Sequence, residues 1–85
     1  MEKKFHLDIL NAQETVYSGD ALSLVVPAQL GYLGVLADHA PLAAKILPGK
    51  ITIRESSGTM RQLDIKTPGI MEVFSNNVTL LLDNA

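Results

Sequence analysis

Apolar and polar residues alternate along most of this chain, and this period of two constrains its fold more than any other feature. Alternation over four to six residues is typical of a β-strand with one buried face, because successive side chains point to opposite sides. The alternating apolar residues fall in five stretches: Phe5, Leu7 and Ile9; Leu22, Leu24 and Val26; Ile51 and Ile53; Leu63 and Ile65; Val78, Leu80 and Leu82. The sequence therefore predicts a fold built from short strands.

Turn-forming residues separate these stretches at short intervals. They are the segments YSGD at 17–20, PG at 48–49, SSGT at 56–59, PG at 68–69 and SNN at 75–77. Glycine and asparagine adopt positive φ at little cost, and proline presets φ for the first turn position. We therefore expect hairpins over 51–65 and 69–82, within an all-β sandwich or barrel.

Two segments leave a local choice open. DHAPLAAKIL at 38–47 would be a short helix if Asp38 capped it and Pro41 lay in its first turn. A strand or an irregular crossing segment is favoured, because Pro48 ends the segment after barely two turns. Pro27 lies inside an apolar run, so that strand is an edge, contains a bulge or ends there.

Composition bounds the class of protein. The 85 residues predict one domain, 1–85, and 47% of them are hydrophobic, which is enough to fold. The net charge is −2 with scattered basic residues, which argues against nucleic-acid binding. Cysteine is absent, so disulfides and thiolate metal sites are excluded. We expect neither a signal peptide nor a membrane helix, because the charge-free run Ala21–Ala37 is short and contains proline and glycine.

Few residues suggest chemistry. His6 and His39 are the only histidines, and with Asp8 and Asp38 they have no recognised metal-ligand spacing. His39 follows Asp38 directly, and adjacent strand residues point to opposite faces, so they do not pair readily as a base and its orienting carboxylate. No serine lies in a nucleophile-elbow pattern. We therefore expect no catalytic, metal or cofactor site.

The two glycines of GYLG are not a phosphate loop. Gly31 and Gly34 lack the lysine and the strand–loop–helix context of such a loop. We interpret Gly31 as a turn residue. We interpret Gly34 as a position where a side chain would collide with a neighbouring strand or a partner.

The stretch Tyr32–Leu36 is apolar on both alternating faces, with Leu33 and Val35 on one face and Tyr32 and Leu36 on the other. A half-buried strand normally has one polar face. The stretch is therefore either a covered core strand or a docking surface, where tyrosine is common. Composition alone leaves these two interpretations open.

Three segments carry motifs in the order expected for one family. They are FHLDILNAQETVYSGDA at 5–21, GYLGVLADHAPLAAKILPGKITI at 31–53 and TPGIMEVFSNNVTLLLDNA at 67–85. Together they resemble the ε subunit of F-type ATP synthase, whose central signature is Gly–x–Leu–Gly–Ile–x–x–x–His–Ala–Pro–Leu. The resemblance covers essentially the whole chain, and its most specific part is His39-Ala40-Pro41-Leu42 with Gly31 and Gly34.

The resemblance implies a two-layer β-sandwich of roughly ten short strands. It also implies a non-catalytic subunit of the central stalk that couples the γ subunit to the polar loops of the membrane c-ring. Such a subunit is peripheral, at the cytoplasmic face of a bacterial cell membrane, and binds no nucleic acid and no cofactor. The expected interface residues are Gly31, Tyr32, Leu33, Gly34, His39, Ala40, Pro41, Leu42 and Ala44.

The chain departs from the family pattern in two places. The family usually continues into a C-terminal pair of helices that can brake rotation and, in some members, bind ATP. The chain ends at Ala85, so we expect no helical hairpin and no tight ATP binding. Tyr32 replaces a residue that is often acidic, and Ala37-Asp38 replace Pro-Gly, so we expect an aromatic contact with the ring in place of a charged one. The alternative is a free-standing β-sandwich enzyme or small-ligand binder that uses His39 and Asp38.

Overall fold

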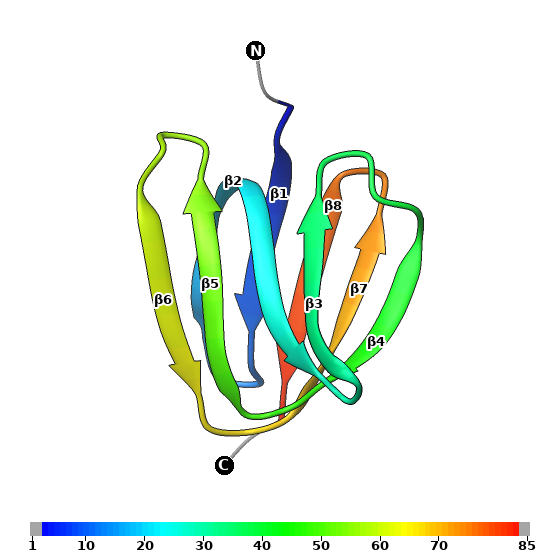
Figure 1. The fold of residues 1–85 in the computed structure, drawn as a ribbon. Helices are drawn as coiled ribbons and strands as arrows, with labels where there is room; N and C mark the ends of the chain where they lie inside the picture. The colour runs from blue at the N-terminus through cyan, green and yellow to red at the C-terminus, as the bar shows by residue number, and fades with distance from the viewer. Residues whose placement is uncertain (1–2, 84–85) are drawn as a thin grey trace.

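Strands account for most of the chain. The computed structural model describes residues 3–83, over which it contains eight strands and no helix (Figure 1). The strands are β1 (Phe5–Leu10), β2 (Thr15–Ala28), β3 (Gly31–Leu36), β4 (Leu42–Ile46), β5 (Gly49–Glu55), β6 (Met60–Ile65), β7 (Gly69–Phe74) and β8 (Asn77–Leu82). The predicted all-β fold is confirmed, with eight strands in place of roughly ten. The segment 38–47 contributes strand β4 rather than a helix.

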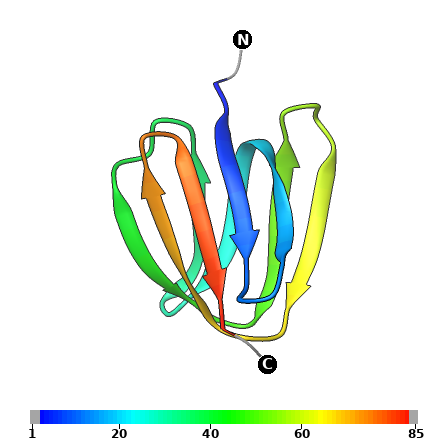
Figure 2. The ribbon, with the colours of Figure 1, turned by 180° about the vertical axis from the view of Figure 1, so that it is seen from behind.

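The eight strands form one sheet that folds into two layers. Its order is β1-β8-β7-β4-β2-β5-β6, with β3 added to β2 and β1 also paired with β2. The first half of β2 pairs with β1 and the second half with β5 and β3, so this 14-residue strand belongs to both layers. The layer of β6, β5 and β3 lies in front in Figure 1, and Figure 2 shows β4, β7, β8 and β1 from the other side.

The inward faces of both layers make one hydrophobic core. Its most buried large side chains are Phe5, Leu7, Ile9, Leu24, Val26, Val35, Ile46, Ile51, Ile53, Met71, Val78 and Leu80. Most of the alternating residues predicted from the sequence therefore face inward. Leu22 is an exception, because the register of β2 against β5 shifts between Ala21 and Ser23 and places Ala21 inward instead.

Both predicted hairpins form. Gly58 lies in the β5–β6 turn with φ 96°, and Ser75 and Asn76 join β7 to β8 with φ of 48° and 60°. Two consecutive positive φ values are typical of the type I′ turn, whose twist matches that of the flanking strands. The expectation for Pro27 also holds, since β2 ends one residue later at Ala28.

The uncharged segment Ala21–Ala37 contributes the second half of β2 and all of β3. Within the part of the chain that the structure describes, no helix is long and apolar enough to cross a membrane.

Candidate partner interface

Strand β3 has one buried and one exposed apolar face. Val35 is buried and Leu33 is half-buried against the core, whereas 69% of Tyr32 and 64% of Leu36 are exposed. We call the outward residues Tyr32, Gly34 and Leu36 the β3 strip. One face of this stretch is therefore core, and the other is an open apolar surface next to β2, for which a docking role stays a prediction.

The two glycines behave differently. Gly31 closes the β2–β3 turn with φ 124°, as the sequence predicted, because only glycine adopts this conformation without strain. For Gly34 the prediction of a clash inside the chain is wrong, since an added Cβ would meet nothing within 4 Å. Within the chain, Gly34 leaves a gap between Tyr32 and Leu36 on the surface.

Asp38 fastens the loop after β3 to the β7–β8 turn. Its backbone N–H donates to Asn76 Oδ1 at 2.6 Å, and Asn76 Nδ2 donates to Asp38 Oδ1 at 3.0 Å. Lys3 Nζ donates to Asp38 Oδ2 at 2.8 Å. Hydrogen bonds from Lys3 first and Asn76 second hold the pKa of Asp38 below its ordinary value. Two segments that are distant in sequence, around Lys3 and Asn76, therefore fix this loop.

His39 is turned away from this cluster. Its Nδ1 lies 2.8 Å from the carbonyl oxygen of Ala40, and none of the polar contacts of Asp38 involves the imidazole. As we expected from their adjacency, Asp38 and His39 do not form a base and its orienting carboxylate. Ala40 and Pro41 are exposed, and Leu42 is half-buried against the core.

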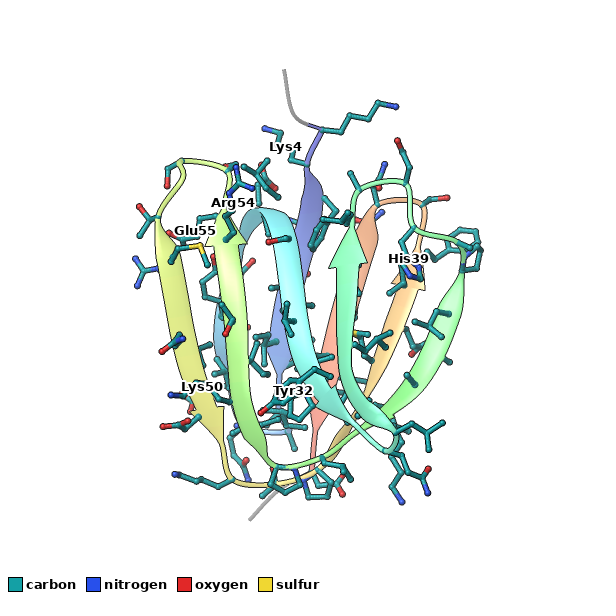
Figure 3. All side chains as sticks on the ribbon, in the orientation of Figure 1. Lys4, Tyr32, His39, Lys50, Arg54 and Glu55 are labelled. Atoms are coloured by element: carbon teal, nitrogen blue, oxygen red, sulfur yellow. The ribbon has the colours of Figure 1, made fainter. Side chains whose placement is uncertain are left out.

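The predicted interface residues do not form one compact patch. Figure 3 shows Tyr32 toward one end of β3 and His39 in the loop beyond the other end. Tyr32 and Leu36 are separated by four residues of strand, or about 13 Å. The surface is therefore a ridge that follows β3 and continues into the loop at 37–41.

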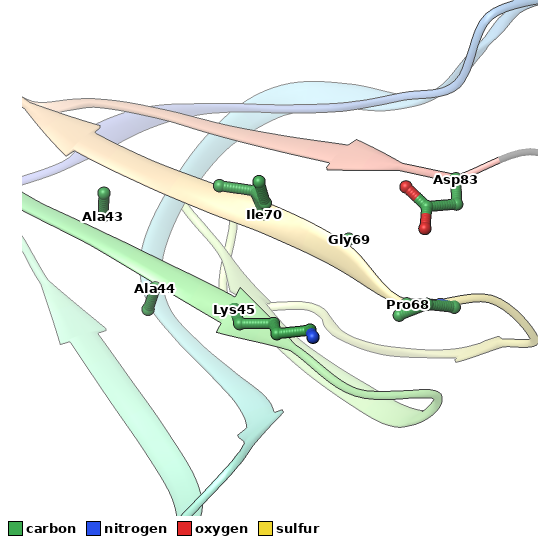
Figure 4. A pocket seen from close by; sticks show the side chains of 7 residues that line it. All are labelled: Ala43, Ala44, Lys45, Pro68, Gly69, Ile70 and Asp83. Atoms are coloured by element: carbon green, nitrogen blue, oxygen red, sulfur yellow. The ribbon is translucent and has the colours of Figure 1, made fainter.

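Ala44, the last predicted interface residue, lines a depression on the neighbouring layer (Figure 4). The depression measures about 440 Å³ and is lined by Ala43, Ala44, Lys45, Pro68, Gly69, Ile70 and Asp83. Lys45 on β4 and Asp83 after β8 lie on opposite sides of β7. Ala44 borders this hollow, but it packs against the core on the same face of β4 as Ile46, and it is separate from the β3 strip.

The sequence did not predict a polar cluster around His6 on the outer face of β1 and β2. His6 Nδ1 lies 3.2 Å from Asp20 Oδ1, and His6 Nε2 lies 3.2 Å from Asp8 Oδ1. Ser18 donates to Asp8 at 2.6 Å and lies 3.5 Å from His6 Nε2. The sequence signal for this cluster was that His6 and Asp8 lie two residues apart and so share one strand face. The contact with Asp20 could not be predicted, because it depends on the β1–β2 register.

This cluster superficially resembles a serine, histidine and aspartate relay, but the hydroxyl of Ser18 does not donate its proton to the histidine. Ser18 donates its proton to Asp8, and the cluster lies on the open sheet surface. The hydrogen bond that Asp20 accepts from His6, aided by Asp8, raises the pKa of His6, and the same bond together with Lys4 lowers the pKa of Asp20. Among residues 3–83, no three histidine, cysteine or carboxylate side chains are grouped to hold a metal ion.

Tyr17 ties the first half of β2 to the opposite layer. Its hydroxyl donates to Glu55 Oε2 at 2.6 Å, and Arg61 Nε donates to the same oxygen at 2.7 Å. Burial, with the hydrogen bond to Glu55, raises the pKa of Tyr17 to about 12. The phenol therefore stays protonated at physiological pH and serves a structural role between the layers.

A second apolar surface lies on the outer face of β7 and β8. Ile70, Phe74 and Leu81 are exposed there, and the register places Ile70 beside Leu81. We call these three residues the β7–β8 strip. The sequence analysis missed this surface; the available signal was that bulky apolar residues occupy the strand positions facing the same way as the polar Glu72 and Thr79.

Comparisons with known proteins agree with the motif order. The chain matches the family described as "ATP synthase, Delta/Epsilon chain, beta-sandwich domain" over residues 4–85. The "ATP synthase epsilon chain" of Alkalilimnicola ehrlichii is 39% identical over 80 residues, which cover 94% of this chain and 56% of that protein. The "ATP synthase epsilon chain 2" of Burkholderia orbicola is 38% identical over 86 residues, which cover 100% of this chain and 56% of that protein. The chain thus spans little more than half the length of the curated relatives it matches.

Two solved structures share the fold. A chain in the Euglena gracilis mitochondrial ATP synthase structure "OSCP/F1/c-ring" matches with a TM-score of 0.85 at 20% identity, over 93% of this chain and 50% of that chain. A chain in the Tetrahymena thermophila mitochondrial ATP synthase structure "central stalk/cring" matches with a TM-score of 0.76 at 13% identity, over 98% of this chain and 66% of that chain. The resemblance found in the sequence is therefore confirmed: the chain belongs to the family of ATP synthase δ/ε-chain β-sandwich domains.

Proposed function

We propose that this chain is part of the rotor of an F-type, proton-translocating ATP synthase, where it couples the γ subunit to the c-ring and performs no catalysis. The observation that carries the proposal is the family match over residues 4–85, joined by relatives named ATP synthase epsilon chain at 39% and 38% identity. The two structural neighbours, whose titles both name the c-ring and in one case the central stalk, support the same assignment.

The physical support is the β3 strip and the loop that follows it. An exposed tyrosine and leucine on a charge-free strand are typical of the centre of a protein contact, where charged residues are depleted. Asp38 and Asn76 hold the adjacent loop in place, so little ordering is required when His39, Ala40 and Pro41 meet a partner. We assign the γ subunit and the polar loops of the c-ring as the partners, which would place the chain peripherally at the cytoplasmic face of the membrane.

The alternative, a β-sandwich enzyme or ligand binder built on His39 and Asp38, has less support. It requires the carboxylate of Asp38 to act on His39, and that carboxylate instead accepts hydrogen bonds from Lys3 and Asn76. The depression beside Ala44 holds neither residue. The geometry therefore favours binding over chemistry.

Co-purification tests the proposal. The chain, tagged, is expressed with the γ subunit and the c-ring subunit from the same source and captured after detergent extraction. We expect γ and the c-ring to be retained with it. Capture of the folded chain without either subunit would refute the rotor assignment.

A further inference from the structure

Strand β3 presents unpaired backbone groups along one side. Among the described strands it pairs with β2 alone. In an antiparallel pair, each residue directs its N–H and C=O to the same side, and the side alternates along the strand. The carbonyl of Pro27 accepts the N–H of Leu47 and so points away from β3. Tyr32, which lies opposite Pro27, therefore directs its own N–H and C=O away from β2.

The same alternation applies to Gly34 and Leu36, so all three residues of the β3 strip direct their backbone groups to the open edge. Sheets usually protect such edges with charged side chains, proline or bulges. Edge strand β6 carries Arg61 and Asp64, and β4 carries Lys45. β3 contains no charge and no proline, and its register against β2 is unbroken.

We propose that two copies of this chain pair through the open edges of β3, antiparallel and centred on Gly34. In this register Gly34 faces Gly34 of the second copy, and Tyr32 faces its Leu36. The positions with free N–H and C=O groups coincide, so the pairing forms three hydrogen-bonded residue pairs. Each Tyr32–Leu36 pair brings an aromatic and an aliphatic side chain together on one face, which favours strand pairing.

Charge and size set the strength of this contact. Both edges are uncharged, so two chains with a net charge of −2 meet without like charges in the contact. The contact is one six-residue edge with two exposed side chains per copy, well under the ~1,600 Å² of a standard interface, so the dimer is weak. It uses the β3 strip that we assign to rotor partners and therefore competes with assembly. The pairing is a property of the free chain and does not depend on the proposed function.

Sedimentation velocity of the isolated chain, from about 10 µM to about 1 mM to suit a weak contact, tests the proposal. We expect the mass to rise from 9.2 kDa toward twice that value. Gly34→Pro removes the central N–H of the open edge while the bonds to β2 remain, and we expect dimerisation to weaken about tenfold or more. The control Gly34→Ala keeps the N–H and places its Cβ in open space. It should dimerise like the wild type.

A contact between Leu33 of one copy and Val35 of the other verifies the register, because these residues form a closely spaced pair there. We expect an isotope-filtered NOE between their Hα protons in a mixed labelled sample. If Gly34→Pro does not fold, Leu36→Lys replaces it as the disruptive variant. A chain that stays monomeric, a dimer that the disruptive variant leaves intact, a missing 33–35 NOE, or a dimer lost in Phe74→Lys would each overturn the proposal. Because the chain is measured alone, none of these outcomes bears on rotor assembly.

Discussion

At the scale of single residues, Gly69 and Gly34 differ most in the space that is available for a side chain. A Cβ on Gly69 would overlap the backbone carbonyl of Leu81 on the neighbouring strand, whereas one on Gly34 would meet nothing within 4 Å. We expect Gly69→Ala to lower the free energy of unfolding by about 1–3 kcal/mol, because backbone must move. Gly34→Ala should change it by less than about 0.5 kcal/mol. Urea denaturation measures both values, and equal stabilities would contradict the packing of β7 on β8.

His6 gives the fold a pH dependence. Its pKa is raised above the ordinary 6.5 in the folded state, chiefly by the hydrogen bond that it donates to Asp20. The protonated form is therefore favoured by folding, and its stabilising contribution is complete below pH 6.5 and lost as the pH rises through the folded pKa. The groups that face His6 are Asp8, Asp20 and Ser18, with Lys4 bound to Asp20.

We predict that the melting temperature of the wild type relative to His6→Gln falls as the pH is raised from about 6 to about 9, since glutamine does not titrate in this range. Calorimetry at several pH values measures the difference. Asp20→Asn should flatten the dependence, because it removes the main cause of the shift. A difference that stays constant over this range would show that His6 gains nothing from its carboxylates.

At the scale of elements, the bond between Asp38 and Asn76 couples two turns. Both residues have positive φ, so glycine replaces each without backbone strain and removes only the side chain. We predict that Asn76→Gly lowers the melting temperature and speeds amide exchange in the loop at 37–41. The double variant with Asp38→Gly should lose less than the sum of the two single losses, because the bond from Asn76 Nδ2 to Asp38 Oδ1 is already absent in each single variant. Fully additive losses in the melting temperature would contradict the coupling.

What the sequence predicted at this scale was local. The hairpins over 51–65 and 69–82 follow from alternation and turn residues that lie within a few positions of each other. The double membership of β2 was not predictable in this way, because it depends on a register shift at Leu22. Likewise, Tyr17 and Glu55 are 38 residues apart, and their hydrogen bond exists only once the two layers close.

At the scale of the whole molecule, the candidate site was predicted only in part. The exposed face of β3 follows from its apolar alternation, and Tyr32 and Leu36 do lie on the surface. The sequence motif grouped Ala44 with Tyr32, although Ala44 lines a hollow beside β7. The β7–β8 strip was missed because a single strand pattern does not show which apolar positions face outward when both faces carry them.

The most direct test of the rotor assignment compares two exposed aromatic residues on opposite layers. Tyr32 lies on the β3 strip with 69% of its surface exposed, and Phe74 lies on the β7–β8 strip with 67% exposed. Affinity for the γ subunit and c-ring assembly is measured by titration for Tyr32→Ala and Phe74→Ala, after melting shows that both remain folded. We predict that Tyr32→Ala weakens binding by ~30-fold, as expected for an aromatic anchor worth ~2 kcal/mol, and that Phe74→Ala changes it by less than about threefold. Unchanged binding by Tyr32→Ala with a large loss for Phe74→Ala would contradict the account and place the docking surface on β7 and β8.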